Sequence, residues 1–291
     1  MIIVMQKQAS ATAIENVVAL IRSRGLQEHI SRGEERTIIG AVGDERVFHP
    51  NELESLPEVE RAIRVLNDWK IISRENHSED SIIRVRNVAF GGSRLLSIST
   101  HTTKAEQADA VFIDPFYRTA QPYAEHDHSS ESAQIKAMKA DINTLHRLEK
   151  PVLVRIRDVR QIEAALQAEA DILYLGGELM SNRSLQDEVG RLNTPVVLCK
   201  DKHHRVDEWL VAAEHIAQRG NRHIILGEAG TLSFEPEHTY RLDTDAIVRV
   251  RIATHLPVIA NISRLWHHDM PQATLYRLAE ACGTNGIIST L

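Results

Sequence analysis

Charged side chains stand at the ends of several short apolar runs, where they could bind an anion. Arg155 lies in "VLVRI", Lys200 ends "VVLCK" and Glu228 ends "HIILGE". Arg264 follows the run "PVIANI", and Arg118 lies in the polar stretch "YRTAQPY". Guanidinium and ammonium groups that converge on one point attract phosphate and carboxylate. One interpretation is therefore a pocket for a small anionic ligand.

Histidines form a second set of residues that could do chemistry, because the chain holds 15 of them. Imidazoles from several loops could form a transition-metal site or an acid–base pair. Neither an HxH nor an HH spacing identifies a site without a third ligand at a fixed offset, so we favour exposed loop histidines and expect no cofactor. The histidines concerned are His101, those of the "EHDH" stretch at 125–128, His203, His204, His267 and His268.

Composition excludes several classes of protein. The net charge is −6 and no basic stripe is present, which argues against a nucleic-acid partner. The two cysteines, Cys199 and Cys282, indicate neither a disulfide framework nor a cysteine-based metal cluster, and they fit a reducing cytoplasm. No apolar run approaches the roughly 18 residues of a membrane span. No Ser/His/Asp triad signature or Walker loop stands out. We expect a soluble cytoplasmic protein.

The first 75 of the 291 residues alternate strand and helix patterns. Strands are expected in "IIVM", "QEHIS", "RTIIGAV" and "RAIRVLN", and helices in "ATAIENVVALIRSRG", closed by Gly25, and in "NELESLPEVE". This βαββαβ order predicts a ferredoxin-like α+β domain over residues 1–75. The polar stretch at 73–81 has no periodicity and is the predicted linker.

Residues 82–291 carry a different pattern. A hairpin is expected first, with its turn near Asn87 and a break at Gly91 and Gly92. Eight apolar runs then alternate with helical stretches: "LLSIST", "AVFID", "VLVRI", "DILYLG", "VVLCK", "HIILGE", "PVIANI" and "GIISTL". Such runs are typical of parallel strands covered by helices, and eight of them predict a (β/α)₈ TIM barrel. An open doubly wound sheet would carry a Gly-rich turn after its first strand, and none follows "LLSIST".

The barrel is expected to have truncated outer helices. Only nine residues separate "LLSIST" from "AVFID", which is too few for a full crossover helix, and no helix follows the eighth strand. These gaps are adjacent around a closed ring. The bare strip predicts a cover, either the small domain or another subunit, so we expect a homo-oligomer.

Several longer stretches resemble the type Iβ 3-deoxy-D-arabino-heptulosonate 7-phosphate (DAHP) synthases. In the small domain they are "HISRGEERTIIGAVGDE" and "LESLPEVERAIRVLNDWKIISRE", and in the barrel "ADILYLGGELMSN", "DEWLVAAEHIAQRGNRHIIL" and "THLPVI". The resemblance runs nearly end to end. It implies a regulatory domain followed by a barrel that condenses phosphoenolpyruvate with erythrose 4-phosphate, using a divalent metal, at the start of aromatic amino-acid (shikimate) biosynthesis.

The resemblance also implies metal-ligand positions, and this chain departs from the family at each of them. The first-strand motif A-G-P-C-S corresponds to "SISTH", which places Thr100 at the cysteine. The seventh-strand motif D-P-S-H corresponds to "NISR", which places Arg264 at the histidine, and Thr290 stands where the eighth strand should supply a glutamate. A guanidinium cannot ligate a cation and a neutral hydroxyl replaces a thiolate poorly, so we expect no metal.

The substrate-binding motifs are only partly kept. K-P-R-T-S-P-Y corresponds to "YRTAQPY", which retains Arg118, and K-R-G corresponds to "CKD", which leaves Lys200. E-R-G-I-R corresponds to "EAGTL", which keeps Glu228 and loses both arginines. Of two interpretations of Arg264, we favour a plug that fills the metal space and pairs with Glu228 or Asp114 over a redesigned anion pocket, because buried charges are normally paired.

These losses favour a catalytically degenerate DAHP synthase homologue, a pseudoenzyme with a binding or regulatory role. Its partners would be an active DAHP synthase, in hetero-association, or a small anionic or aromatic ligand. The alternative is an enzyme whose repurposed barrel site acts on a phosphorylated or carboxylated metabolite. Ordinary DAHP synthase activity ranks last. Function must be argued from the site, since a fold does not fix it.

Overall fold

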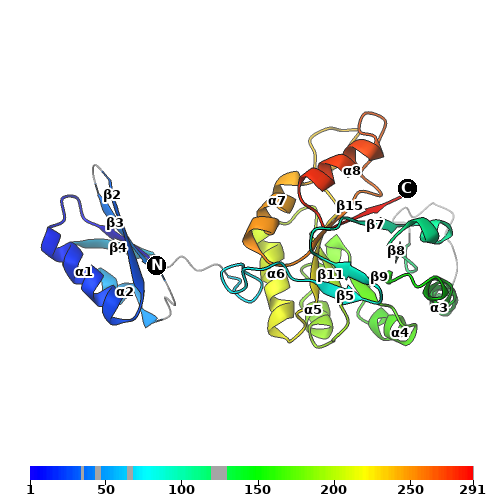
Figure 1. Cartoon of the computed structure of the whole chain (residues 1–291), viewed down its shortest axis with the longest axis horizontal. Coiled ribbons are helices and arrows are strands. Elements are labelled where there is room, and N and C mark those ends of the chain that lie inside the picture. The colour runs from blue at the N-terminus through cyan, green and yellow to red at the C-terminus, as the bar shows by residue number, and fades with distance from the viewer. Residues whose placement is uncertain (34–35, 43–46, 64–67, 119–129, 291) are drawn as a thin grey trace. The chain divides into compact units, whose positions relative to one another are not determined.

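The chain folds into two compact units, Met1–Asp68 and Trp69–Leu291, each described here by itself (Figure 1). The computed structural model describes residues 1–33, 36–42, 47–63, 68–118 and 130–290. Among these residues, no helix combines the length and the apolar composition that crossing a bilayer requires.

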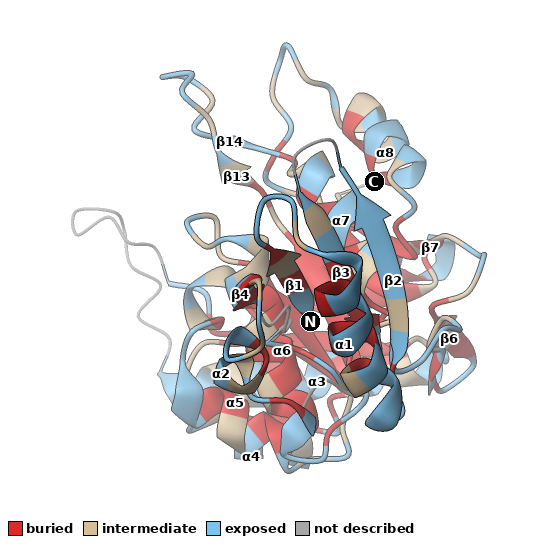
Figure 2. Ribbon diagram, turned by 90° about the vertical axis from the view of Figure 1, so that its left-hand side faces the viewer, coloured by how far each residue is buried: buried red, intermediate tan, exposed pale blue. Residues whose placement is uncertain are grey.

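The first unit is a four-stranded antiparallel sheet with two helices. Its elements are β1 (Ile2–Met5), α1 (Ala11–Ser23), β2 (Gln27–Arg32), β3 (Thr37–Val42), α2 (Pro50–Glu54) and β4 (Val59–Ile63). The strand order is β2-β3-β1-β4. This arrangement confirms the predicted ferredoxin-like domain. Figure 2 shows that β2, at the edge of the sheet, is largely exposed.

The helix α1 begins and ends at the residues that the sequence signals. The Ser10 hydroxyl accepts a hydrogen bond from the Ala13 N–H at 3.2 Å and caps the first turn. Gly25 adopts a φ of +78°, a left-handed conformation that glycine tolerates just past a helix end. Val17 and Ile21 are fully buried in the apolar cluster that joins the helix to the sheet. The apolar face of α1 therefore forms the core of this unit.

The second unit is a closed barrel of eight parallel strands, as the sequence predicts. The strands are β7 (Leu96–Ser99), β8 (Ala110–Ile113), β9 (Val152–Ile156), β10 (Ile172–Leu175), β11 (Val196–Cys199), β12 (Ile224–Glu228), β15 (Val258–Asn261) and β16 (Gly286–Ser289). They close in the order β10-β11-β12-β15-β16-β7-β8-β9. All eight apolar runs in the sequence contain one of these strands.

Helices cover most of the barrel. They are α3 (Glu131–Arg147), α4 (Gln161–Gln167), α5 (Arg183–Gly190), α6 (Val206–Gln218), α7 (Thr244–Ala253) and α8 (Gln272–Ala281), with a short 3₁₀ helix η3 (Gly177–Leu179) after β10. Between β7 and β8 the chain forms only the 3₁₀ helix η2 (Thr102–Gln107), which confirms the truncated crossover. Self-association through this strip stays a prediction.

The second unit begins before the stretch predicted as a linker. The backbone N–H groups of Ile71 and Ile72 donate to the two carboxylate oxygens of Glu214 in α6, at 3.0 and 3.2 Å. Ser73 is buried and forms an antiparallel bridge to the segment that precedes β15. Residues 73–81 thus lie on the barrel unit. Their polarity suggested a free linker because backbone hydrogen bonds to distant residues leave no mark in a local pattern.

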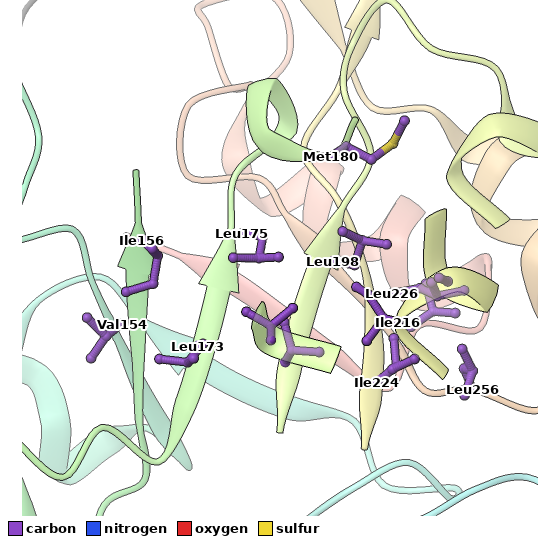
Figure 3. Close-up of a cluster of buried hydrophobic side chains, with 14 of the residues drawn as sticks. Val154, Ile156, Leu173, Leu175, Met180, Leu198, Ile216, Ile224, Leu226 and Leu256 are labelled. Carbon is purple, nitrogen blue, oxygen red and sulfur yellow. The ribbon is translucent and has the colours of Figure 1, made fainter. Parts of the chain in front are cut away.

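Two apolar layers hold the barrel together. The outer layer joins the strands to the helices, and Figure 3 shows part of it, including Val154, Leu173, Leu198 and Leu226 from four successive strands. The inner layer fills the barrel and includes the predicted hairpin, β5 (Ile83–Val85) and β6 (Val88–Phe90). The side chains of the hairpin pack with the inward-facing residues of the strands, so the interior is a packed core and not a pore.

Truncating a buried side chain of the hairpin should lower the stability of the barrel strongly. Phe90 is fully buried in the inner layer. The substitution Phe90→Ala should lower the free energy of unfolding of the barrel by about 3–5 kcal/mol, because it leaves a cavity among strand residues. Chemical denaturation followed by tryptophan fluorescence measures the change. Ile82→Ala, at a half-exposed position beside the hairpin, is the control and should cost far less. Equal losses in both variants would contradict this account of the core.

Candidate functional site

A cavity of about 300 Å³ opens at the end of the barrel where the strands finish. Its wall holds four cationic side chains and three carboxylates, from residues at or just beyond the C-terminal ends of β8, β9, β10, β11 and β15. Parallel strands bring these ends to one edge, which is where TIM-barrel enzymes carry their active sites. The charged residues are Asp114, Arg155, Glu178, Lys200, Asp201, Lys202 and Arg264.

Four charges form a closed ring on one side of the cavity. Arg157 donates to both carboxylate oxygens of Asp114, at 3.0 and 2.7 Å. Arg155 donates to both oxygens of Glu178, at 3.0 and 3.1 Å, and its guanidinium also lies 3.6 Å from Asp114. Arg157 completes the ring with a 3.2 Å bond to Glu178. Because each guanidinium has two acidic partners, both arginines are held in fixed orientations.

Glycines after β10 make room for this ring. A Cβ atom on Gly176 would lie 2.4 Å from a terminal nitrogen of Arg155, closer than atoms can approach. A Cβ atom on Gly177 would lie 3.0–3.1 Å from the backbone of Lys200 and Asp201. The Gly pair in "DILYLGG" is therefore needed for close approach of the neighbouring strand ends. One nitrogen of Arg155, Nε, is buried with no hydrogen-bond partner among the described residues.

Lys200, which lines the cavity, and Glu228, which lies below it, are almost completely buried. The Lys200 ammonium pairs with Asp243 at 3.2 Å. Glu228 accepts a hydrogen bond from the Gly230 N–H through Oε1, while Oε2 is buried without a partner among the described residues. Burial raises the pKa of Glu228 to about 7, against the weaker opposing effects of the Gly230 hydrogen bond and the Lys200 charge. Near neutral pH this group can therefore hold or release a proton.

Arg264 does not plug the barrel, so the pairing predicted from the sequence is wrong. Its side chain is exposed and makes no ion pair with Glu228 or Asp114. Its guanidinium lies over the ring of Tyr117, 4.7 Å from the centroid, and Arg157 lies over the same ring at 5.2 Å. Asp114 is already held by two other arginines, and Glu228 lies too deep to be reached. An aromatic ring stabilises a guanidinium group that lies over it, but the group keeps its positive charge.

Lys202 is a second cation that lies over a tyrosine ring. Its ammonium lies 3.2 Å from the centre of the Tyr240 ring, and burial lowers its pKa from the ordinary value. Among the described residues, neither Lys202 nor Arg264 has a carboxylate partner within ion-pair distance. These two positive groups are therefore available to an anionic ligand in the cavity.

The floor of the cavity is neutral. Tyr174 packs edge-on against Phe112, with ring centroids 4.8 Å apart, and accepts a 3.4 Å hydrogen bond from Asn261. Burial raises the pKa of the Cys199 thiol to about 12 and also raises that of the Tyr174 hydroxyl. A thiol with such a pKa stays protonated and is a poor nucleophile and a poor metal ligand.

Arg118 lies away from the cavity residues just described. It lines an adjoining depression of about 280 Å³ together with Arg157, Arg160 and Gln134. Arg157 also belongs to the charge ring, so it connects the two sites. Of the five residues predicted to form an anion pocket, the structure places Arg155, Lys200 and Arg264 on one cavity. It places Glu228 just below that cavity and Arg118 beside it.

The three residues that the sequence resemblance places at the family's metal-ligand positions, Thr100, Arg264 and Thr290, do not form a ligand set. The Thr100 N–H donates to the Ser289 carbonyl at 3.0 Å, and the Thr290 hydroxyl donates to Gln272 at 2.6 Å. Arg264 is a cation. Divalent metals need carboxylates, neutral imidazoles or thiolates, and these residues supply none.

Several cavity residues that could in principle bind a metal, among those that the structure describes, are also unsuited to it. The oxygens of Asp114 and Glu178 already accept bonds from two arginines, and the Cys199 thiol is protonated. Four cationic side chains line the same wall and would repel a metal ion. Asp114, Glu178 and Cys199 therefore do not form a site for a divalent cation, and no step of the chemistry below depends on one.

The predicted histidines fall into separate places. His101 is exposed at the start of η2, and His203 and His204 flank Asp201 at 3.6 and 3.0 Å. His203 lines the cavity. His267 and His268 lie together in the loop between β15 and α8. The "EHDH" stretch at 125–128 lies outside the described residues.

Sequence reasoning missed Arg157, Glu178, Lys202 and Tyr117. The signal for Arg157 is present in "VLVRIRD", because residues two apart on a strand face the same side. Glu178 and Lys202 each follow a strand end by only a few residues, which is where barrel loops carry functional groups. The role of Tyr117 has no such signal, since its partners come from two other strand ends.

Comparisons with known proteins were made for the whole chain. Residues 1–67 match the model of the DAHP synthase ferredoxin-like domain, and residues 130–288 match that of the DAHP synthetase I family. A phospho-2-dehydro-3-deoxyheptonate aldolase of Thermotoga maritima is 30% identical over 99% of this chain and 88% of that protein. The crystal structure of a Thermotoga maritima aldolase of that name superposes with a TM-score of 0.68 and 28% identity, covering 99% of this chain and 86% of the other.

A truncated form of 3-deoxy-D-arabino-heptulosonate 7-phosphate synthase from Thermotoga maritima also matches, with a TM-score of 0.65 and 24% identity. It covers 76% of this chain and 84% of the other. At that identity the likeness supports the barrel fold alone. The two family models give the order of the domains along the chain, with the ferredoxin-like domain before the synthetase domain.

These relatives overturn the expectation of a catalytically degenerate homologue, and with it the pseudoenzyme interpretation and the alternative of a repurposed site. That expectation took the changed metal positions and the partly kept substrate-binding motifs as signs of lost activity. A relative that is named as an aldolase matches the chain over nearly its full length, and the mouth of the barrel holds an open cavity where a plug had been predicted. The interpretation that ranked last, ordinary synthase activity, is the better supported.

Glu228 yields a prediction for the dependence of stability on pH. Its pKa in the folded protein, about 7, lies above its ordinary value of 4.5. The folded state therefore keeps a proton that the unfolded state loses, and the stability that this group contributes is complete below pH 4.5 and lost as the pH rises to 7. The loss should be about 3 kcal/mol.

The variant Glu228→Gln isolates this effect, because an amide keeps the oxygen that accepts from Gly230 and does not titrate. The difference in unfolding free energy between the two proteins, measured by denaturation from pH 4 to pH 8, should change by that amount in favour of the variant. A constant difference across this range would show that the carboxyl group is not perturbed.

Proposed function

Because the chain belongs to the DAHP synthetase I family, we propose that it is an active phospho-2-dehydro-3-deoxyheptonate aldolase. It condenses phosphoenolpyruvate with erythrose 4-phosphate at the mouth of the barrel. The observation that carries the proposal is the cavity at the strand ends, with its two cations that lack a carboxylate partner among the described residues. Both substrates are phosphorylated, and one also carries a carboxylate.

The reaction requires a site that gathers negative charge. A bond forms between C3 of phosphoenolpyruvate and the aldehyde carbon of the aldose, whose oxygen takes up a proton. Water then adds at C2 of the former phosphoenolpyruvate and inorganic phosphate leaves. Fixed positive groups stabilise the negative charge that develops during such steps, because they are already oriented when the reaction begins.

We assign the binding of substrate anions to Arg264 and Lys202. Each lies over a tyrosine ring, Tyr117 and Tyr240, which positions the charge while leaving its hydrogen-bond donors free. Arg155 has spare capacity as well, since its Nε has no partner among the described residues. Its ion pairs with Asp114 and Glu178 keep this guanidinium in a fixed position beside the ligand.

Glu228 is assigned a proton-holding role beneath this cavity. Its carboxyl group has a pKa of about 7 and can exist in either protonation state near neutral pH. It is fully buried, so exchange of its proton with bulk water is slowed. Its neighbour Lys200 is paired with Asp243, which fixes the local charge.

The proposal predicts measurable synthase activity and a defined loss in variants. With both substrates supplied, the wild-type chain should consume phosphoenolpyruvate and form the heptulosonate product. Arg264→Ala and Lys202→Ala should each lower kcat/KM by about 10- to 100-fold, because each removes one charged contact to an anion. Steady-state assays of phosphoenolpyruvate absorbance measure both effects.

Arg191→Ala is the matched control, since Arg191 follows the last residue of α5 and pairs only with Glu188 among the described residues. It should keep wild-type kinetics. Absence of product in the wild type under all substrate concentrations would refute the proposed activity. Normal kinetics in both cavity variants would refute the assignment of the anion-binding groups.

A further inference from the structure

A cluster of two histidines and an aspartate lies on two loops at the mouth of the barrel. His238 belongs to the hairpin between β13 (Thr231–Leu232) and β14 (Tyr240–Arg241), and His267 and Asp269 belong to the loop between β15 and α8. These segments are separated by helix α7 and strand β15 in the sequence. Their ligand atoms, one from each side chain, all lie within 4.8 Å of one another.

The backbone fixes both parts of the cluster. The backbone N–H groups of His267 and Met270 each donate to the carbonyl of the other, both at 3.1 Å, which makes a tight turn. In the hairpin, the Ser233 N–H donates to the Thr239 carbonyl at 2.8 Å. The loops that carry the three side chains are therefore held by backbone hydrogen bonds.

The side chains face one another across the two loops. The His238 and His267 rings stack with centroids 3.4 Å apart and planes inclined by 11°. Asp269 directs one oxygen toward His238 Nε2, at 3.7 Å, and accepts a bond from His268 through the other, at 2.9 Å. The distance of 3.7 Å is too long for a good hydrogen bond. The carboxylate oxygen and the imidazole nitrogen face each other without being joined.

An independent observation comes from His267. Its Nδ1 is buried and has no hydrogen-bond partner among the described residues. A buried polar atom without a partner is costly, and such atoms in folded proteins call for an explanation, of which an ion is one. Nδ1 can act as the ligand atom of a neutral imidazole when the proton is on the other nitrogen.

We propose that His238, His267 and Asp269 bind a divalent transition-metal ion such as Zn²⁺. Two imidazole nitrogens and one carboxylate oxygen match the preferences of Zn²⁺, Co²⁺ and Ni²⁺, whereas Mg²⁺ and Ca²⁺ prefer oxygen ligands alone. Binding at about 2.0–2.2 Å from each atom would draw the three side chains together and end the parallel stack of the rings. Water completes the coordination.

The ion ties together two loops that also carry cavity residues. Tyr240 lies two residues after His238, and Arg264 lies three residues before His267; both line the cavity. Linking the loops restricts the movement of these two side chains relative to each other. The site is separate from the positions of Thr100, Arg264 and Thr290, and it does not depend on whether the chain is an active aldolase.

Metal binding to the full-length chain, purified without a histidine tag and treated with chelator, tests the proposal. Equilibrium dialysis against Zn²⁺ should show one ion bound per chain at micromolar or lower free metal. Co²⁺ should give a visible absorption band with the intensity of a four- or five-coordinate site. His238→Ala and His267→Ala should each weaken Zn²⁺ binding at least tenfold and remove the band.

His203→Ala is the matched control, because this exposed histidine also lies at the mouth but outside the cluster. It should bind Zn²⁺ as the wild type does. Thermal unfolding of the metal-free variants shows that they are folded, and added Zn²⁺ should raise the melting temperature only of the wild type and the control. No bound ion in the wild type, or equal binding in His267→Ala, would overturn the proposal. Neither result bears on the aldolase assay.

Discussion

Closure of the eight-stranded parallel sheet is the constraint on which the rest of the barrel depends. Once β16 pairs with β7, every strand has two neighbours and all the C-terminal strand ends lie at one edge. The inner apolar layer, which includes the hairpin β5–β6, fills the interior, so charged residues can collect only beyond the strand ends. That arrangement concentrates seven charged side chains around one cavity without burying most of them in the apolar core.

Pairing within the cavity wall then divides its charges into two kinds. Arg155 and Arg157 are held by two carboxylates and have fixed positions, while Arg264 and Lys202 rest on tyrosine rings and keep their donors free. The first kind gives the wall its shape, and we propose that the second attracts anions. The protonated Cys199 and the neutral Tyr174 keep the floor free of negative charge that would oppose binding.

Local patterns in the sequence predict the fold well and the site only partly. Each of the eight strands follows from an apolar run, and the strand ends give the positions of Arg155 and Lys200. The ring of Arg157, Asp114 and Glu178 depends on side chains from three strand ends, which no local pattern reveals. Arg264 was expected to turn inward because it follows a buried strand at the position that matches the family's ligand histidine, but it is exposed and lies over the ring of Tyr117. The inference of lost activity failed because it compared single motif positions and did not include the cations that line the cavity elsewhere, such as Lys202.

The central claim is that this cationic cavity processes phosphoenolpyruvate together with an aldose phosphate. The most direct test follows the phosphorus signals of the substrates by ³¹P NMR in the presence of the purified chain. We predict that the phosphoenolpyruvate signal is converted to inorganic phosphate only when erythrose 4-phosphate is also present, and in equal amount to the heptulosonate phosphate formed. A phosphoenolpyruvate signal that persists in the complete mixture, or phosphate release that does not need the aldose, would contradict the account.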